Sequence, residues 1–310
     1  MTIAFVHNNK AFLPGLYGYR QFFARYGVHC EVVTPDELSI THRNIEWFFL
    51  GSDISKPREG IFKIHEYPSA SLPPFRKWKD WVKSFFNTQP DFRIFQNQFV
   101  KDALGFHDAI PFGMRELGIP EEWLAPVPKF AKEYDFIYIG DISVSRRMKE
   151  LLEVFTQSLS DKTMLILSHR YEDLSEQYKD YKNILFKGPV QKDQVREFLL
   201  KSRFAFNYIP DISPFNRQTS TKLLEYIACK IPIISTQYQW MEEFQSREGG
   251  KYYYLNKDLS NLDWKSINEF DYQFPDLSDW TWENQIRKSG VLEFITSNFP
   301  EINFDAESEV

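Results

Sequence analysis

Short apolar segments alternate with stretches of helical periodicity along most of the chain. The apolar segments predict β-strands at 2–6, 29–34, 47–51, 60–67, 92–97, 135–141, 163–168, 183–190, 203–209 and 231–236. The amphipathic stretches predict helices at 19–27, 75–86, 99–104, 146–159, 171–181, 192–202 and 278–288, and one more that begins at 219. A turn with two glycines is expected at 14–18. Strands that alternate with helices are typical of parallel sheets covered by helices, so the expected fold class is α/β.

The length of the chain, 310 residues, is sufficient for two domains. A segment rich in proline and charge, GIPEEWLAPVPKFAKEY at 118–134, separates two runs of alternating strands and helices and is a suitable interdomain linker. We therefore expect two Rossmann-like β/α/β domains, at 1–128 and 129–280, that face each other across a cleft.

Charge and composition narrow the function classes only a little. The formal net charge is −6, with the acidity concentrated after residue 130, so bulk electrostatics gives no case for nucleic-acid binding. Cys30 and Cys229 stand far apart in apolar contexts, which is typical of reduced thiols, and no Cys/His spacing predicts a zinc site. The chain shows neither a signal-peptide pattern nor an apolar run as long as a membrane span, so a cytoplasmic protein is expected.

A polar loop that opens onto a helix is the first candidate binding site. Ligands of parallel sheets bind beyond the carboxyl ends of the strands, where the loop 210–221 begins. The loop leads into four residues at a predicted helix start, Thr219, Ser220, Thr221 and Lys222. The free N–H groups and the positive dipole end of a helix attract anions there. Glu225 lies one turn further on the same face, and a carboxylate suits paired sugar hydroxyls. Taken alone, these residues favour the commoner arrangement, a Ser/Thr-capped helix with a surface Lys–Glu pair.

Two further loops follow predicted strands. In YIGDISVSRRMKELL, at 138–152, a strand ends at Gly140 and a polar loop carries Arg146 and Arg147 to a helix start. Arginine opposes the helix dipole there unless an anion is present, and its fork binds phosphate through two hydrogen bonds; otherwise the two arginines are simply exposed to solvent. The backbone of FKGPV, at 186–190, can flank a flat base. The motifs GxGxxG, GxxxxGK[ST] and GxSxG are absent from the sequence.

Together these segments resemble the GT-B glycosyltransferases, specifically glycosyltransferase family 4, whose members are retaining enzymes that use nucleotide-sugar donors. The resemblance spans nearly the whole chain. It is strongest over 135–236, in YIGDISVSRRMKELLEVF, ILFKGPVQKDQVREFLLKSRFAFNYIP and STKLLEYIACKIPIIST. The order and spacing of these segments carry it, since any one of them alone is unspecific.

The resemblance implies a donor site in the second domain. It implies that Glu225 holds the ribose hydroxyls, that Arg146 and the helix start at 219–222 hold the diphosphate, and that the loop at 187–190 contacts the base. The donor-binding set that it implies also includes Gly140, Ser143, Arg147, Gly188, Val190 and Arg217. The segment SDWTWENQIRK, at 278–288, is similar to the family's C-terminal tryptophan segment, which implies that 281–310 form a helix crossing back to the first domain.

In the first domain, GIFKIHEYPSAS resembles the family strand that ends in a histidine beside the donor sugar. This gives His65 a catalytic role at the carboxyl end of a strand. A surface or core-edge histidine with a local hydrogen bond is the other interpretation, and both stay open. The turn Pro14–Gly18, which includes Gly15, corresponds to the family's glycine loop, which faces the diphosphate.

Three positions depart from the family pattern. Asp141 stands where an arginine usually follows the glycine, and Lys230 lies near a position that is often glycine. Arg217 replaces the first glutamate of a Glu-x7-Glu pair, which puts the usual contact to the donor sugar in question.

The expected activity is transfer of a sugar from a nucleoside diphosphate donor, UDP or GDP, to a glycan or lipid-linked acceptor in cell-surface polysaccharide synthesis, with retention. Arg146, Lys222 and the helix start would stabilise the leaving diphosphate, with His65 beside the sugar. No cofactor and no metal ion are required. One alternative is an inverting transferase with Glu66 or another carboxylate as general base. Another is a non-catalytic nucleotide-sugar-binding subunit of a glycosyltransferase complex.

The predicted helix FRKWKDWVKSFF, at 75–86, has an unusually wide apolar stripe. Its apolar positions are Phe75, Trp78, Trp81, Val82, Phe85 and Phe86, and its basic positions are Arg76, Lys77, Lys79 and Lys83. The ordinary interpretation, which we prefer, is a helix that packs its stripe on the first sheet while its lysines face water. Apolar coverage with basic flanks is also what an interfacial helix needs, and it would place the protein at the inner face of the membrane.

Overall fold

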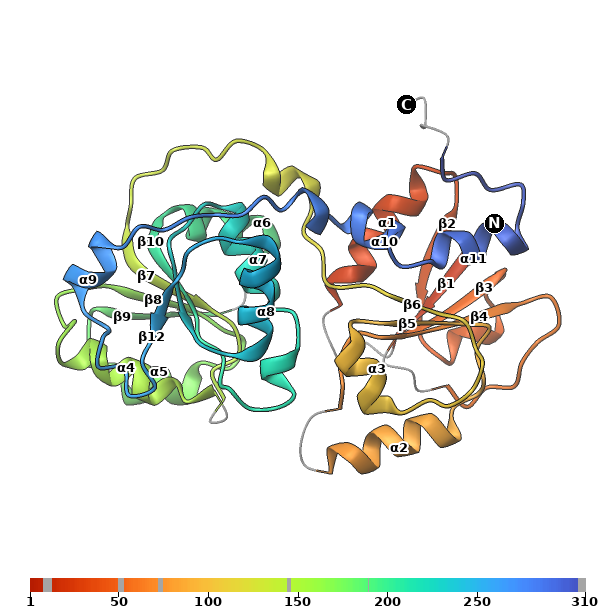
Figure 1. Cartoon of the computed structure of the whole chain (residues 1–310), viewed down its shortest axis with the longest axis horizontal. Helices are drawn as coiled ribbons and strands as arrows, with labels where there is room; N and C mark the ends of the chain where they lie inside the picture. Colours follow the sequence, from red (N-terminus) through yellow and green to blue (C-terminus); the bar gives the residue numbers. More distant parts are fainter. Residues whose placement is uncertain (8–12, 50–52, 72–74, 144–145, 189, 306–310) are drawn as a thin grey trace. The chain divides into compact units, whose positions relative to one another are not determined.

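The structure, a computed structural model, describes the whole chain except residues 8–12, 50–52, 72–74, 144–145, 189 and 306–310 (Figure 1). The chain divides into two compact units, one made of Met1–Pro120 with Asp279–Val310 and the other of Glu121–Ser278. Each unit contains one six-stranded sheet whose neighbouring strands are parallel. The predicted α/β class, with two Rossmann-like domains, is confirmed.

The sheet of the first unit has the strand order β2-β1-β3-β4-β5-β6. Its strands are β1 (Thr2–Val6), β2 (His29–Val33), β3 (Ile45–Phe49), β4 (Phe62–Tyr67), β5 (Phe92–Phe95) and β6 (Phe112–Met114). Its α-helices are α1 (Pro14–Ala24), α2 (Arg76–Phe86), α3 (Gln98–Leu104), α10 (Trp282–Arg287) and α11 (Val291–Asn298). Side chains of α1, α10 and α11 pack with Phe5, Trp47 and Ile94 in one apolar core, so the C-terminal helices complete the first unit.

The predicted turn at 14–18 is wrong, because α1 begins at Pro14 and continues through both glycines. Proline suits the first position of a helix, where its missing N–H has no partner to lose. Gly18 is needed in mid-helix because α10 approaches closely. A Cβ atom on Gly18 would lie 2.5 Å from Cγ of Trp282.

The preferred interpretation of 75–86, a stripe packed on the first sheet, is also wrong. The helix forms as α2, but Phe75, Trp78, Trp81, Phe85 and Phe86 are 53% to 77% exposed. Figure 1 shows α2 beside α3, which it contacts. The periodicity locates a helix correctly but does not reveal which of its faces the protein covers.

The sheet of the second unit has the strand order β12-β11-β10-β7-β8-β9. Its strands are β7 (Tyr134–Ile139), β8 (Met164–Leu167), β9 (Ile184–Lys187), β10 (Ser202–Asn207), β11 (Ile233–Thr236) and β12 (Tyr253–Leu255). Its α-helices are α4 (Met148–Thr156), α5 (Glu172–Gln177), α6 (Lys192–Leu200), α7 (Thr221–Ala228), α8 (Gln239–Glu248) and α9 (Trp264–Glu269). The chain runs outward from β7 to β9 and then returns through β10 on the other side, so the strand order reverses between β7 and β10.

The described residues contain no helix that is both long enough and apolar enough to cross a membrane.

Candidate functional site

A pocket of about 220 Å³ lies where the strand order of the second unit reverses. This is the place where open parallel sheets bind their ligands. The carboxyl ends of β7 and β10 border the pocket together with the start of α7. Its lining residues are Tyr138, Ile139, Gly140, Asp141, Arg146, Phe206, Asn207, Tyr208, Ile209, Thr219, Ser220, Thr221 and Lys222.

The start of α7 is tied firmly to the sheet. Oγ of Ser220 caps the helix by accepting the Leu223 N–H at 3.2 Å, and it donates to Oδ1 of Asn207 at 2.9 Å. Nδ2 of Asn207 donates in turn to Oγ of Ser235 at 2.9 Å and to the hydroxyl of Tyr238 at 3.0 Å. The first turn of a helix presents N–H groups that lack intrahelical partners. This network therefore fixes an anion-attracting helix end at the pocket.

Arg146 brings a positive charge to the same pocket. Its guanidinium carbon lies 4.2 Å from the ring centroid of Phe215, which holds the side chain in place. Its Nε lies 3.9 Å from Oδ2 of Asp141, too far for a hydrogen bond, and is buried without a hydrogen-bond partner among the described residues. An oxyanion in the pocket would complete the hydrogen bonding of this guanidinium.

Lys222 and Glu225 form a pair one turn into α7. Nζ of Lys222 donates to Oε2 of Glu225 at 2.7 Å. The predicted shared face of these residues is therefore confirmed, but the pair is not a surface pair, because Glu225 is only 9% exposed. A carboxylate held this deep behind a pocket is suited to accept hydrogen bonds from ligand hydroxyls.

The loop after β7 has a defined shape. The Tyr138 hydroxyl donates to the carbonyl of Asp141 at 2.7 Å and would lie 3.1 Å from a Cβ atom on Gly140, whose φ is +155°. The Asp141 carboxylate accepts from Ser143 Oγ at 2.6 Å. Glycine therefore fits position 140, and the half-exposed Asp141 sets a negative charge at the rim that Arg146 partly offsets.

The structure brings six of the predicted donor residues together in this pocket: Gly140, Arg146, Thr219, Ser220, Thr221 and Lys222. Glu225 adjoins them through Lys222. The predicted residues outside the lining are Ser143, Arg147, Gly188, Val190 and Arg217. Arg147 is exposed and paired with Glu150 at 2.6 Å, whereas Gly188 lies against the ring of Tyr171. The middle of the predicted base loop, Pro189, lies outside the described residues.

Comparisons with known proteins bear on the same region. Residues 144–258 match a family model described as glycosyl transferase-like. A search of curated proteins finds no match to the chain.

The solved structures extend the likeness to the whole chain. HepE of Anabaena, solved in complex with UDP-glucose, is 10% identical with a TM-score of 0.61, over 97% of this chain and 99% of that one. Sucrose-phosphate synthase of Thermosynechococcus elongatus is 12% identical with a TM-score of 0.62, over 97% and 98%. AviGT4, a glycosyltransferase involved in avilamycin A biosynthesis, is 12% identical with a TM-score of 0.56, over 99% of each chain.

The chain has the GT-B fold of glycosyltransferases. The predicted resemblance is confirmed at this level, and the matched domain contains most of the pocket, from Arg146 to Lys222. Assignment to family 4 and retention of configuration stay predictions.

In the first unit of this GT-B chain, His65 lies on β4 with none of its surface exposed. Its Nε2 is 3.3 Å from Oδ2 of Asp53, which also accepts from Nζ of Lys63 at 2.6 Å. Burial lowers the pKa of His65, while Asp53 opposes that shift. The ring is therefore built into a buried charged cluster, and its catalytic role stays a prediction. Gly15 lies in the first turn of α1, beside the guanidinium of Arg115.

Several residues of the site were not found from the sequence. Asn207, Tyr208, Ser235 and Tyr238 line the pocket or brace it. A polar Asn207 directly after the apolar run FAF, at 204–206, was the available signal, because polar residues at strand ends gather at one edge of a parallel sheet. The described residues contain no group of three or more His, Cys, Asp or Glu that can hold a metal ion.

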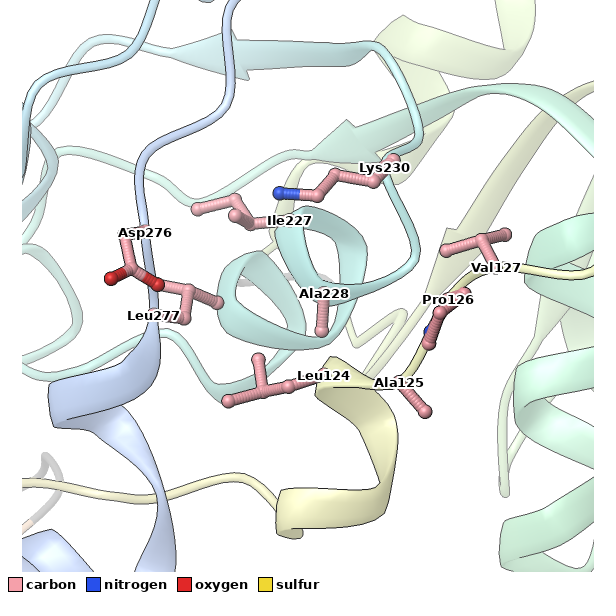
Figure 2. A pocket seen from close by; sticks show the side chains of 9 residues that line it. All are labelled: Leu124, Ala125, Pro126, Val127, Ile227, Ala228, Lys230, Asp276 and Leu277. Atoms are coloured by element: carbon pink, nitrogen blue, oxygen red, sulfur yellow. The ribbon is translucent and has the colours of Figure 1, made fainter.

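A second pocket, of about 230 Å³, lies at the other end of α7 (Figure 2). It is lined by Leu124, Ala125, Pro126, Val127, Ile227, Ala228, Lys230, Asp276 and Leu277. Most of these side chains are aliphatic, and Figure 2 shows Lys230 and Asp276 at its edge. None of the predicted site residues lies there.

Proposed function

We propose that this protein transfers a sugar from a nucleoside diphosphate donor to a hydroxyl of an acceptor. One observation carries the proposal: the start of α7, Lys222 and Arg146 converge on a single pocket at the point where the strand order reverses. A helix N-terminus with two cations is suited to a diphosphate. The glycosyl transferase-like domain over 144–258 and the UDP-glucose bound to HepE support the same assignment.

In the proposed reaction an acceptor oxygen forms a bond to the anomeric carbon as the bond from that carbon to the phosphate oxygen breaks. The diphosphate leaves with both electrons of the broken bond, and its terminal phosphate takes the acceptor proton. Negative charge therefore grows on the diphosphate in the transition state. Arg146, Lys222 and the N–H groups at the start of α7 stabilise that charge.

Glu225 serves the nucleoside rather than the reaction. Its carboxylate lies one turn behind the diphosphate position and accepts hydrogen bonds from two ribose hydroxyls. Lys222 then shifts from its contact with Glu225 toward the phosphates. UDP is the first donor nucleotide to test, with GDP second.

We further propose that transfer retains the anomeric configuration and that the acceptor is a glycan or a lipid-linked sugar at the inner face of the membrane, in cell-surface polysaccharide synthesis. Glu66, the base of the inverting alternative, is 1% exposed and is engaged by Arg115 and Trp47. A buried, ion-paired carboxylate is unsuited to deprotonating an acceptor. The first unit therefore gives no support to inversion through Glu66.

A thermal-shift panel of UDP-, GDP-, dTDP- and CMP-sugars tests donor binding, because a ligand of the native state raises the midpoint of unfolding. We expect one nucleotide to raise it both as the free diphosphate and as the sugar. Incubation with that donor and candidate acceptors, with analysis of the product anomer, then tests transfer. Tight binding without transfer or hydrolysis would favour the non-catalytic subunit.

Arg146→Ala and Lys222→Ala are the decisive variants. Each should lose more in kcat than in donor affinity, since charge on the diphosphate grows as the bond breaks. Lys149→Ala and Arg203→Ala are matched controls, because both remove an exposed cation of the same unit outside the pocket. Wild-type turnover in both decisive variants would place the diphosphate elsewhere.

A further inference from the structure

Helix α2 presents an exposed aromatic face in the first unit. We define this face by Phe75, Trp78, Trp81, Phe85 and Phe86, whose exposed fractions are 77%, 64%, 53%, 69% and 61%. Three of these rings form a cluster: Trp81 stacks on Phe85 at 5.4 Å, and Phe85 meets Phe86 edge-on at 5.2 Å. Contiguous exposed apolar surface of this kind marks an interaction site.

Helix α2 exposes its aromatic face to solvent, whereas an amphipathic helix on a soluble protein ordinarily buries that face. Its one acidic residue, Asp80, is 1% exposed and accepts the N–H of Ser71 at 3.1 Å. Lys83 is half-buried, and burial lowers the pKa of its amine. The acidic side chain of α2 therefore faces the protein while its aromatic side chains face outward, an arrangement that is costly unless something covers the aromatic face.

The surface continues beyond the helix. The N–H of Thr88 donates to the carbonyl of Asp53 at 2.7 Å, and its hydroxyl donates to the carbonyl of Ser55 at 2.6 Å. These bonds hold the loop that carries Ile54, which is 88% exposed, next to the end of α2. The exposed Lys56 follows in the same loop. Two segments of the first unit thus contribute apolar and basic side chains to one surface.

The charge of α2 indicates what kind of partner covers its aromatic face. Four of the eleven residues of α2 are Lys or Arg and one is Asp, which is buried, although the whole chain has a net charge of −6. An anionic partner complements this helix. A second copy of the chain is disfavoured, because a two-fold contact through α2 would bring the same positive charges together.

We propose that the aromatic face of α2 docks on the surface of an anionic lipid bilayer. Tryptophan and phenylalanine rings enter the boundary between headgroups and acyl chains, while Lys79, Lys83 and Lys56 contact lipid phosphates. Docking of this kind would bring the first unit to acceptors that reside in the membrane. It goes beyond the donor chemistry proposed above and does not depend on it.

Co-sedimentation of the full chain with vesicles tests the proposal. One set of vesicles contains phosphatidylcholine alone and the other a mixture with phosphatidylglycerol. We expect binding to the anionic set that is at least about tenfold tighter and that weakens with salt. Brominated lipids should quench tryptophan fluorescence, and the quenching should disappear in Trp78→Phe/Trp81→Phe.

Two double variants separate the contribution of the aromatic rings to vesicle binding from that of the lysines. Trp78→Ser/Trp81→Ser removes exposed rings, and Lys79→Glu/Lys83→Glu reverses two charges; each should weaken binding to anionic vesicles by about tenfold or more. Phe112→Ser is the matched control, since Phe112 is exposed in the first unit but lies on β6, and it should bind as the wild type does. An unchanged midpoint of thermal unfolding without ligand shows that each variant is folded, whether or not the protein binds a nucleotide.

Three results would overturn the proposal. The first is equal binding to neutral and anionic vesicles. The second is binding that survives both double variants. The third is self-association in solution that Trp78→Ser/Trp81→Ser abolishes while no variant affects vesicle binding, which would make the aromatic face an interface between copies of the chain.

Discussion

Glu225 shows how a single buried carboxylate links the fold to the proposed donor site. It is 9% exposed and 2.7 Å from Nζ of Lys222 at the start of α7. We expect Glu225→Ala to weaken binding of nucleoside diphosphate and of donor alike, by about 1–3 kcal/mol, because hydrogen bonds to a charged group are lost. Titration calorimetry measures both affinities. Unchanged affinity in a folded variant would remove Glu225 from the site.

The burial of His65 leads to a prediction about how the stability of the protein depends on pH. Burial lowers its pKa from 6.5, with Lys63 and Arg93 adding to this effect and Asp53 opposing it. As the pH falls, the unfolded chain protonates this histidine before the folded chain does, so the unfolded state binds more protons. Its contribution to stability is therefore fully present above the unfolded pKa and is lost as the pH falls toward the folded pKa.

The variant His65→Gln should lack this pH dependence. Urea denaturation at a series of pH values from about 8 to about 5 measures the free energy of unfolding. We expect the difference between wild type and variant to change across that range in favour of the variant at low pH. His42→Gln, at an exposed position of the same unit, is the control. A constant difference for His65→Gln would show that the folded protein protonates this ring normally.

At the scale of residues, the sequence predicts the polar ends of elements but not buried charges. Gly140, Arg146 and the start of α7 were identified because each follows a recognisable strand or opens a helix. Lys63, Asp53 and Glu46 form a cluster that is at most 2% exposed, and no pattern indicated it. From sequence alone, charged residues in and near a strand are predicted to face solvent. Only the tertiary structure shows that these charges neutralise one another inside the protein.

At the scale of elements, the contact between α1 and α10 depends on one glycine. The Trp282 ring fills the space beside Gly18, where a Cβ atom would lie 2.5 Å from Cγ of the ring. We expect Gly18→Ala to destabilise the protein by about 1–3 kcal/mol, as overpacking of a core does, although alanine is the better helix former. Thermal or urea denaturation measures the loss.

Gln21→Ala is the matched control for Gly18→Ala, because Gln21 lies on the exposed side of the same helix. Its effect should remain within about 0.5 kcal/mol. A stabilised Gly18→Ala variant would mean that α1 and α10 separate at little cost, contrary to the close approach of Trp282.

Apolar runs located strands, whereas helical periodicity did not show which face of a helix the protein covers. All the strands predicted in the second unit are present, because each contains a short apolar run of the kind that a parallel sheet buries, whereas β12 was not predicted. The periodicity of 75–86 correctly predicted helix α2, but the stripe was predicted to face the first sheet and it faces outward. An apolar stripe has the same sequence pattern in either orientation. Helix α1 was shortened because glycine was taken as a sign of a turn rather than of close packing.

At the scale of the whole molecule, the two units differ in how the chain builds them. The second is one continuous segment, Glu121–Ser278, whereas the first needs both ends of the chain. The C-terminal end supplies Ile286, Val291, Leu292, Ile295 and Phe304 to the core of the first unit, and all five are buried. At about 1.5–3 kcal/mol for each buried side chain, their combined burial contributes roughly 8–15 kcal/mol, comparable with the whole stability of a domain.

We therefore expect the fragment 121–278 to unfold cooperatively by itself, and the fragment 1–120 to show no cooperative transition. Joining 1–120 to 279–310 through a short Gly/Ser linker should restore folding. The two ends already meet, since the N–H of Ile119 donates to the carbonyl of Trp280 at 2.8 Å and the N–H of Trp282 donates to the carbonyl of Ile119 at 2.9 Å. Calorimetry and circular dichroism of the three proteins measure this. A cooperative transition in 1–120 alone would show that the first unit folds without α10 and α11.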